Sequence, residues 1–517
     1  MVKSKKSKSK KQKNNSKSND TPNKKLDFET LKTHLFGAAD KVRKRLDPAE
    51  YRPIVMTLLF IKRLNDVYEE NVEKLKKQGK SDKEANQKFR HDFFIPDSAR
   101  WDVLFKEQKN FGAKINEISR LIEDENERLD DVLTNTKFDS LKKYPDDTLE
   151  DLITHFNEYN LADSNLENTD IFGDAYEYLL EDFASETKKK GGQFYTPREV
   201  VNLLVNIVKP KEGMRICDPT CGSGGMLIRS HTFVEENNGD PDKLTLHGQE
   251  SNYATVGMCK MNLVLHGVSD FNIVHDDVLA NPLLVEGGKL LQYHRVLANF
   301  PFSEDWKNAN AEKDPYGRFR FGVPPAKDKA DFAFIQHMYA ALDDEEGGQA
   351  AIISSQGVLF RGGEEEKIRR GLYDADAVEA IIALPSKLFF GTSIPGCVLI
   401  LNKNKPKERK GKILFIYAAK DFQEGKVRNL LRDSDIKKIV SAFENFKDID
   451  KYCHVADKEE LEENEFNFNV PRYVDISEPE KEVDIQKTWD ELQDLGKEAD
   501  DIENKVRADL KELEFKT

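Results

Sequence analysis

The first part of the chain carries apolar residues at helical spacing. Between residues 26 and 165 they recur at three- and four-residue steps, which predicts amphipathic helices. Asp47, Pro48 and Glu50 supply a side-chain acceptor, a proline for the first turn and a carboxylate at the third position, an order typical of a helix start. The helix that follows is apolar at Val55, Leu58, Leu59, Ile61, Leu64 and Val67. Because no reactive cluster stands out, we expect a helical domain used for docking or packing.

The pattern changes between residues 166 and 475, where short apolar runs alternate with helical segments and Gly-containing turns. Such runs are typical of buried strands, and their alternation with helices favours a parallel sheet. The expected strands are Met214–Cys217, Leu244–Gly248, Phe271–Val274, Arg295–Ala298, Gln349–Ser354, Ala377–Ala383 and Cys397–Asn402. The fold class that we predict for this part of the chain is therefore α/β.

Residues 476–517 have a third pattern, in which one apolar stripe is flanked by acids and lysines. The stripe consists of Ile485, Trp489, Leu492, Leu495, Ala499, Ile502, Val506, Leu510 and Leu513. This spacing predicts a long amphipathic helix. Such a helix can pack on its own domain or pair with a partner, and the length and terminal position of the stripe favour a partner.

Composition narrows the class of protein. A chain of 517 residues with 38% hydrophobic residues, 31 Phe among them, can bury large cores, which excludes disorder of the whole chain. No run of 18 apolar residues occurs, so we expect no membrane span, and the basic N-terminus lacks the apolar segment of a secretory signal. The cysteines number five and contain no CxxC pair. This argues against a disulfide scaffold or a cysteine zinc site and favours a cytoplasmic location.

The charge is unevenly distributed. The formal net charge is −14, which taken alone argues against nucleic acid as a partner. Residues 1–25, however, hold ten Lys and a single acid, Asp20. This segment lacks periodic apolar residues, so we expect a disordered tail. Its basic side chains would attract phosphates non-specifically, or the segment is only a solubilising tail or an extension.

A glycine-rich loop lies between an expected strand and an expected helix. Residues 216–225 read Ile-Cys-Asp-Pro-Thr-Cys-Gly-Ser-Gly-Gly, and a helix is expected over Met226–Val234. Small residues let the backbone approach a ligand, and a helix N-terminus offers free N–H groups. A carboxylate at Asp218 would repel a pyrophosphate but suits a positively charged amino acid moiety. Taken alone, the loop is also compatible with an ordinary turn.

Two more acids follow the next two strands. Glu250 ends one strand, where a carboxylate can hydrogen-bond a ribose diol. Asp277 follows the other strand, where it can accept from an adenine amine. Each acid alone is compatible with a solvated strand end, but three successive strands that end in acids are hard to attribute to chance. Together they predict a site for a cationic adenosine compound.

The following strand ends in Asn299, Phe300, Pro301 and Phe302. An Asn amide oxygen and a neighbouring backbone carbonyl can both accept from an exocyclic amine, and Phe302 can stack on a base lifted from its duplex. Such an arrangement directs the lone pair of the amine toward an electrophilic methyl group. Positioning of the amine and the dipoles of the two carbonyl groups would provide the rate acceleration, so neither a metal nor a covalent intermediate is required.

In combination, these residues resemble the modification (M) subunit of type I restriction–modification systems. The resemblance runs in family order from about residue 28 to the C-terminus and rests on Gly192–Arg198, Asp218–Gly224, Asn299–Phe302, Lys329–Ile335, Phe390–Pro395 and Asn469–Tyr473. It implies transfer of a methyl group from S-adenosyl-L-methionine (AdoMet) to the exocyclic N6 of adenine in double-stranded DNA. It also implies a Rossmann-like methyltransferase core over residues 166–475, after the helical domain and before a C-terminal helix used for subunit assembly.

The resemblance also assigns residues. The cofactor would contact Gln193, Phe194, Tyr195, Thr196, Pro197, Arg198, Asp218, Thr220, Gly222, Ser223, Gly224, Gly225, Glu250 and Asp277, and the target adenine would contact Asn299, Phe300, Pro301 and Phe302. The family usually has Pro where this chain has Phe300. The hydrogen bond at that position comes from the backbone carbonyl, which Phe retains. We therefore predict that activity is retained.

The resemblance further implies partners: a specificity (S) subunit that selects the DNA sequence, with two M subunits for each S, and a restriction (R) subunit. Phe300 is the one feature that favours an alternative, a catalytically silent assembly subunit. A stand-alone adenine methyltransferase is a second alternative. It would need a further domain of about 150 residues to read bases, a typical domain size, and none remains after Asn299. Methylation of a protein Gln amide is a third, which the helical N-terminal domain and the terminal helix make less suitable.

Overall fold

The computed structural model describes residues 25–43, 45–46, 48–107, 109–138, 146–168, 170–185, 195–307, 311–327, 329–477 and 484–512. The chain divides into two compact units, residues 1–474 and residues 475–517. Apart from Lys25, the expected tail at residues 1–25 lies outside the described residues. The prediction of disorder for that tail therefore stays a prediction.

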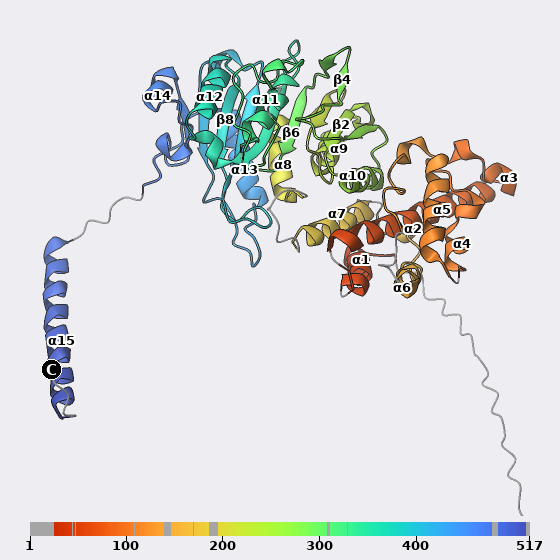
Figure 1. Cartoon of the computed structure of the whole chain (residues 1–517), viewed down its shortest axis with the longest axis horizontal. Coiled ribbons are helices and arrows are strands. Elements are labelled where there is room, and N and C mark those ends of the chain that lie inside the picture. The colour runs from red at the N-terminus through yellow and green to blue at the C-terminus, as the bar shows by residue number, and fades with distance from the viewer. Residues whose placement is uncertain are drawn as a thin grey trace, which may run out of the picture. The chain divides into compact units, whose positions relative to one another are not determined.

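The N-terminal part of the first unit consists of α-helices, as the apolar spacing predicts (Figure 1). They are α1 (Phe28–Arg43), α2 (Pro48–Lys77), α3 (Asp82–Ala85), α4 (Trp101–Phe105), α5 (Phe111–Asp124), α6 (Asp146–Phe156) and α7 (Asp170–Ser185). Along α2, the positions expected to be apolar are buried except Val67, which is half-buried. The helix begins at Pro48, but Asp47 lies outside the described residues, so its capping role stays a prediction.

One hydrophobic core joins these helices to the α/β part of the unit. α10 (Tyr253–Leu265) contacts both α2 and α7. Met258 and Met261 of α10 belong to the same buried cluster as Leu35 of α1 and Phe172 of α7. The helical part is therefore packed directly against a helix of the sheet-containing part.

A nine-stranded sheet forms the centre of the α/β part, in the order β11-β10-β8-β9-β7-β6-β1-β2-β3. Its strands are β1 (Arg215–Asp218), β2 (Thr245–Glu250), β3 (Phe271–His275), β6 (Arg295–Asn299), β7 (Gln349–Ser355), β8 (Val378–Ala383), β9 (Gly396–Asn402), β10 (Ile413–Tyr417) and β11 (Cys453–Ala456). β4 (Val285–Glu286) and β5 (Lys289–Leu290) form a separate two-stranded ribbon. All seven strands that the apolar runs predict are present, with ends shifted by one or two residues.

The sheet is mostly parallel, as the alternation of apolar runs and helices favours. β3, β2, β1, β6 and β7 pair in parallel. β9 runs antiparallel to both of its neighbours, β7 and β8, and β11 runs antiparallel to β10. An apolar run shows that a strand is buried on both faces, but it does not show the direction in which the strand enters the sheet.

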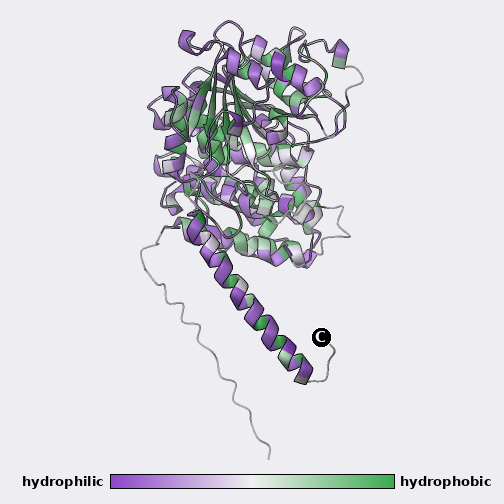
Figure 2. Ribbon diagram, turned by 90° about the vertical axis from the view of Figure 1, so that its left-hand side faces the viewer, coloured by the Kyte–Doolittle hydropathy of each residue, from purple (hydrophilic) through white to green (hydrophobic). Residues whose placement is uncertain are grey.

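Helices pack on the sheet, and the strand order reverses near its middle. α8 (Arg198–Val208), α9 (Gly225–Glu236), α10 and α13 (Asp433–Asn445) share one hydrophobic core with strands of the sheet. Figure 2 shows hydrophobic residues (green) gathered in the sheet, with polar ones (purple) on the outer helices. α11 (Asp331–Ala340) also packs on β7, while α12 (Glu364–Asp374) and α14 (Lys458–Glu463) follow later in the chain. Strand order reverses between β6 and β1. In open α/β sheets, ligands bind at such a reversal, beyond the carboxyl ends of the strands.

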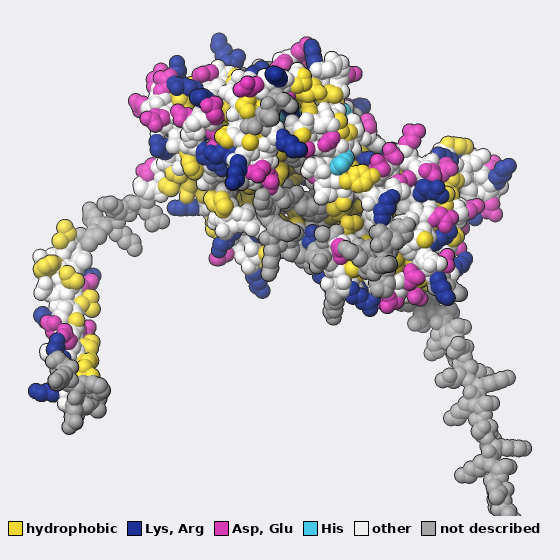
Figure 3. Space-filling model, viewed as in Figure 1, with side chains coloured by type: hydrophobic (Ala, Val, Ile, Leu, Met, Phe, Trp, Pro, Cys, Tyr) yellow, Lys and Arg dark blue, Asp and Glu magenta, His cyan; other side chains and the backbone are white. Residues whose placement is uncertain are grey.

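The second unit contains the helix α15 (Ile485–Glu512), as the stripe of apolar residues predicts. Trp489, Leu492 and Leu495 expose 56%, 58% and 62% of their surface. Figure 3 shows apolar side chains (yellow) along this helix, with acidic and basic side chains beside them. Leu513 lies outside the described residues. Within the described ranges, none of the helices has the length and apolar character needed to cross a membrane.

Candidate active site

The glycine loop after β1 lines a pocket with its backbone. Gly222 and Gly224 have φ angles of +51° and +83°, a conformation that residues with a Cβ disfavour. A Cβ on Gly224 would also lie 2.9 Å from Cys259 Sγ of α10. The Ser223 carbonyl accepts a hydrogen bond from Asn262 Nδ2 at 2.9 Å. The loop is therefore packed closely against α10, and α9 starts directly behind it.

Asp218 places a buried carboxylate at the end of β1. The residue is only 2% exposed, and its Oδ1 accepts the backbone N–H of Thr220 at 3.0 Å. Burial raises the pKa of Asp218 to about 7, and the charge of Glu250 acts in the same direction. Among the described residues, no cationic side chain forms an ion pair with this carboxylate. The position therefore favours a ligand that brings positive charge.

Glu250 braces the glycine loop from the next strand. Its Oε2 accepts the backbone N–H of Gly222 at 3.1 Å, and its Oε1 accepts that of Asn252 at 2.8 Å. Burial raises the pKa of this carboxyl as well. The structure thus brings Glu250 to the loop, at the carboxyl end of β2, while its role toward a ribose stays a prediction.

Asp277 follows β3, and the N–H of its neighbour Asp276 donates to the Glu250 carbonyl at 3.1 Å. Asp277 is exposed, and its Oδ1 accepts the N–H of Leu279 at 2.9 Å within its own turn. The sequence did not single out Gln249, which is fully buried and donates to the carbonyls of Asp276 and Asn281. Gln249 ties the segment that carries Asp277 to β2. No local motif reveals this role, because the partners of Gln249 are about thirty residues away.

Asn299 closes the pocket at the end of β6. The pocket is lined by Thr196, Asp218, Gly222 and Asn299 among others. Asn299 Nδ2 donates to Thr196 Oγ1 at 3.0 Å. No donor among the described residues reaches its buried Oδ1. Since buried acceptors normally have a partner, this oxygen has the capacity to accept a hydrogen bond from a ligand in the pocket.

The two phenylalanines after Asn299 have different surroundings. Phe300 is 1% exposed and stacks on Phe334 of α11, with ring centroids 4.9 Å apart and planes inclined by 16°. Phe302 is half-buried and meets Phe300 and Phe389 edge to face, at 5.8 and 6.4 Å. Phe300 is thus an anchor in the core, and its aromatic packing constrains the loop where the family usually has a proline.

The segment before α8 reaches the pocket in part. Tyr195 and Thr196 line it, and Pro197 stands at the start of α8. Arg198 forms ion pairs with Asp174 and Glu177 of α7, at 3.0 and 2.8 Å. Its guanidinium thus faces carboxylates of the helical part, and a contact with the cofactor stays a prediction. Gln193 and Phe194 lie outside the described residues.

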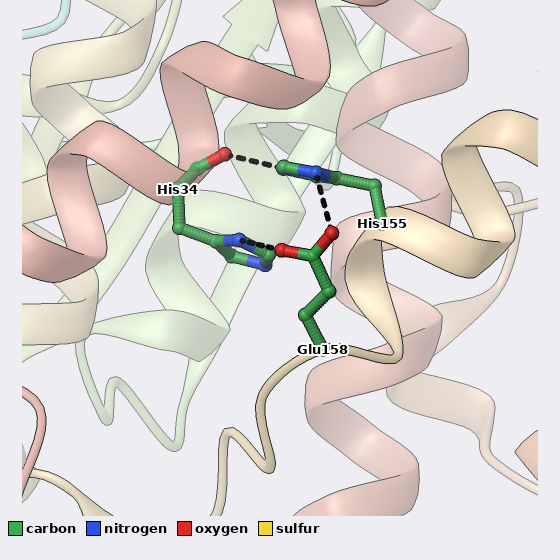
Figure 4. Close-up of side chains that lie close together, drawn as sticks. All are labelled: His34, His155 and Glu158. Carbon is green, nitrogen blue, oxygen red and sulfur yellow. Dashed lines mark hydrogen bonds and ion pairs between the residues drawn. The ribbon is translucent and has the colours of Figure 1, made fainter. Parts of the chain in front are cut away.

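Two histidines that look isolated in the sequence meet away from this pocket. His34 of α1 stacks on His155 of α6, with centroids 4.2 Å apart and planes inclined by 17° (Figure 4). Both face Glu158, at 4.0 and 3.6 Å, and His155 Nε2 bonds to the His34 carbonyl at 2.8 Å. An ion bound to both stacked rings would lie outside both ring planes, where imidazole lone pairs do not point. We therefore interpret the cluster as a contact between α1 and α6.

Fold and site together define the class of protein: an α/β methyltransferase with a glycine loop at the strand-order reversal. The chain matches the N-6 DNA Methylase family over residues 167–482 and the HsdM N-terminal domain over residues 31–156. A type I restriction enzyme MjaVIII methylase subunit from Methanocaldococcus jannaschii is 35% identical over 484 residues, which are 90% of this chain and 81% of the relative. The type I restriction enzyme HindI methylase subunit from Haemophilus influenzae is 32% identical, and the aligned region spans 75% of this chain and 91% of that subunit.

Solved structures agree. The type I restriction–modification methyltransferase subunit from Streptococcus thermophilus superposes with a TM-score of 0.75 at 30% identity, and the match covers 87% of this chain and all of that one. This chain belongs to the N-6 DNA methylase family and is a methylase subunit of the type I restriction–modification class. Its activity is N6-adenine methylation of DNA, and the fold class and enzyme class predicted from the sequence are confirmed.

Proposed function

We propose that the pocket beside the glycine loop binds AdoMet, the cofactor of this family. The buried, unpaired carboxylate of Asp218 and the close backbone of Gly222 to Gly225 fit a cationic amino acid moiety. Glu250, which accepts the Gly222 N–H, would hold the ribose, and Asp277, on the segment tied to Gln249, would receive the adenine. The residues that lead into α8, Gln193 to Pro197, and its first residue, Arg198, would bind the methionine end of the cofactor.

Asn299 would hold the target adenine, and its unpartnered Oδ1 is the observation that carries this proposal. Oδ1 would accept one N–H of the exocyclic amine, and the Phe300 carbonyl would accept the other. Phe302 would stack on the flipped base. AdoMet, when bound, supplies a methyl group on a sulfonium. Asn299 Oδ1 and the Phe300 carbonyl would aim the amine lone pair at that methyl carbon, so that an N–C bond would form as the S–C bond breaks and the surplus proton of the nitrogen would pass to water.

The same proposal includes the assembly. The chain belongs to a class of subunits of type I complexes, and we propose an S subunit that selects double-stranded DNA, an R subunit, and two copies of this chain for each S. α15 would supply a contact, because its apolar stripe is exposed. Sequence choice by S would account for a methylase chain with a net charge of −14.

The test is Asn299→Ala in the chain assembled with its S subunit, with transfer of labelled methyl groups to site DNA as the readout. We expect methylation to fall at least about 100-fold, as when a preorganised acceptor or donor is removed from an active site, while assembly and AdoMet binding persist. Asn402→Ala is the matched control, since Asn402 Nδ2 bonds Glu379 at 2.9 Å, outside the pocket. A wild-type complex that transfers no methyl group to its own site would favour a silent assembly subunit.

A further inference from the structure

A buried carboxylate outside the pocket ties the turn after Asn299 to two other segments. Asp331, the first residue of α11, is fully buried. Its Oδ1 accepts the backbone N–H of Ser303 at 2.7 Å. Its Oδ2 accepts the hydroxyl of Ser355 at 2.9 Å and Nη1 of Arg361 at 3.3 Å. One side chain therefore joins the turn after β6, the end of β7 and the segment before α12.

The turn that Asp331 holds is strained. Ser303 has a φ angle of +55°, and the left-handed conformation costs roughly 1–2 kcal/mol for a residue with a Cβ. Phe334 lies one turn after Asp331 on the same face of α11 and stacks on Phe300. α11 thus fixes both ends of the segment between Phe300 and Ser303. Pro301 and Phe302 lie between these two fixed points.

The network is built for a carboxylate. Asp331 receives three donors, and an ionised carboxyl group is an acceptor only. Arg361 also pairs with the buried Glu365, Oε1 to Nη1, at 3.2 Å. In Asp331→Asn, the amide would offer N–H groups where Ser355 and Arg361 already donate. The substitution preserves volume and removes one acceptor.

We propose that Asp331 is a positioning residue for methyl transfer. This role of Asp331 rests on the proposed function of Asn299 and adds how Asn299 is positioned. Among the described residues, those that line the pocket do not include Asp331. Asp331 therefore acts through the turn that it holds. It holds the turn so that Asn299 Oδ1, the Phe300 carbonyl and the Phe302 ring converge on the extruded base.

The test compares Asp331→Asn with the wild type, each assembled with its S subunit on DNA that carries the target site. We expect kcat for methylation to fall about 10- to 100-fold, as for a displacement of about 1 Å at a reacting group, with Kd for AdoMet and for DNA unchanged. With 2-aminopurine in place of the target adenine, the fluorescence of the bound duplex should differ between variant and wild type, because the base is held differently.

Asp343→Asn is the matched control. Asp343 is also a buried carboxylate that accepts two backbone N–H groups, from Glu345 and Glu346, and pairs with an arginine, Arg215. Asp343 lies before the first residue of β7, whereas Asp331 bonds Ser355 at the carboxyl end of β7. The control should lose thermal stability and keep the wild-type kcat and 2-aminopurine signal.

A wild-type kcat in Asp331→Asn would overturn the proposal, as would equal loss of kcat in the Asp343 control. If Asp331→Asn does not fold, Ser355→Ala decides, because it removes one donor to Asp331 and leaves the charge. It should lower kcat a few-fold without changing AdoMet binding, and an unchanged kcat would count against the proposal. A wild-type complex without methylation, or an active Asn299→Ala complex, would instead contradict the proposed function.

Discussion

At the scale of residues, the pocket of the described structure holds a buried carboxylate that has no cationic partner and a buried amide oxygen that has no donor. The Asp218 carboxylate is buried without an ion pair, and Asn299 Oδ1 is buried without a donor. Buried polar atoms are usually satisfied, so such exceptions mark sites where a ligand completes the bonding. The first group calls for a cation and the second for an N–H. Together they match a sulfonium amino acid cofactor and an adenine amine.

The raised pKa of Asp218 predicts how AdoMet affinity depends on pH. The pKa is about 7 in the free protein, and a bound cation would lower it. Binding the cation therefore expels a proton below pH 7. The affinity should fall as the pH drops below about 7, by up to about tenfold per pH unit, which is the limit for one coupled proton. Calorimetric titrations with AdoMet between about pH 6 and pH 8 measure this slope.

Two variants test whether the pH dependence of AdoMet affinity comes from Asp218 or from Glu250. Asp218→Asn should bind more weakly at neutral pH and should lose the pH dependence. Glu250 also has a pKa that burial raises, so Glu250→Gln tests whether the slope belongs to that group instead. A slope that survives in Asp218→Asn would contradict the assignment of the coupled proton to Asp218.

Some residues of the site follow from the sequence and others do not. Asp218, Glu250 and Asn299 stand at strand ends beside recognisable neighbours, and parallel strands bring their carboxyl ends to one edge. The structure places all three around the glycine loop and the pocket. Asp331 was visible only as part of a motif. Its bonds to Ser303 and Ser355 are contacts between residues more than twenty positions apart, which no local pattern encodes.

At the scale of elements, apolar runs predict that strands exist but not how they pair. All seven expected strands form, since buried strands read as continuous apolar runs. The direction of β9 between β7 and β8 depends on the path of the chain around the edge of the sheet. β10 and β11 were not anticipated: β10 follows a lysine-rich segment, and β11 has four residues. The core of the sheet was therefore predictable, and its far edge was not.

The packing of the glycine loop against α10 predicts a cost for Gly224→Ala. The positive φ of +83° and the approach of 2.9 Å to Cys259 Sγ both oppose a Cβ. A penalty of about 1–2 kcal/mol for the left-handed backbone alone corresponds to about 5- to 30-fold. We expect AdoMet affinity to fall by at least that factor, because the loop must move to accommodate the methyl group. Binding titrations on the folded variant measure it.

Gly213→Ala is the control for backbone strain. Gly213 has a φ of +82°, and nothing lies within 4 Å of an added Cβ. This variant should lose stability and retain the wild-type affinity for AdoMet. If Gly224→Ala and Gly213→Ala lose AdoMet affinity equally, the loss comes from general destabilisation and not from the packing of the glycine loop.

The contact between α1 and α6 predicts a pH dependence of stability. Burial, followed by the charges of His155 and Lys62, lowers the pKa of His34 to about 3, while the unfolded chain binds the proton near 6.5. Neutral His34 therefore contributes its full stability above about pH 6.5, and the contribution declines as the pH falls toward 3, by at most about 1.4 kcal/mol per pH unit. In His34→Phe, which keeps an aromatic ring beside Tyr159, Tm should fall less steeply with acid. Equal slopes of Tm against pH in the wild type and in His34→Phe would contradict this prediction.

At the scale of the whole molecule, charge alone is a poor guide to function. A net charge of −14 argues against a nucleic-acid partner, and membership of a DNA methylase family overturns that inference. The apparent conflict disappears if another subunit reads the DNA, as we propose. The chain must then offer a surface for that subunit, and α15 carries the long exposed apolar stripe that such a contact requires.

Replacing two leucines of that stripe by glutamate should prevent assembly with the S subunit. Leu492 and Leu495 are exposed, and glutamate preserves helix propensity, so the free chain should stay folded. Burying a leucine contributes about 1.5–3 kcal/mol, so the double variant should weaken the complex at least about 100-fold. Co-purification and sedimentation with the S subunit measure this loss, while AdoMet binding should remain. Glu498→Gln on a polar position of α15 should assemble normally, and a Leu492→Glu, Leu495→Glu chain that still assembles would exclude the stripe as the contact.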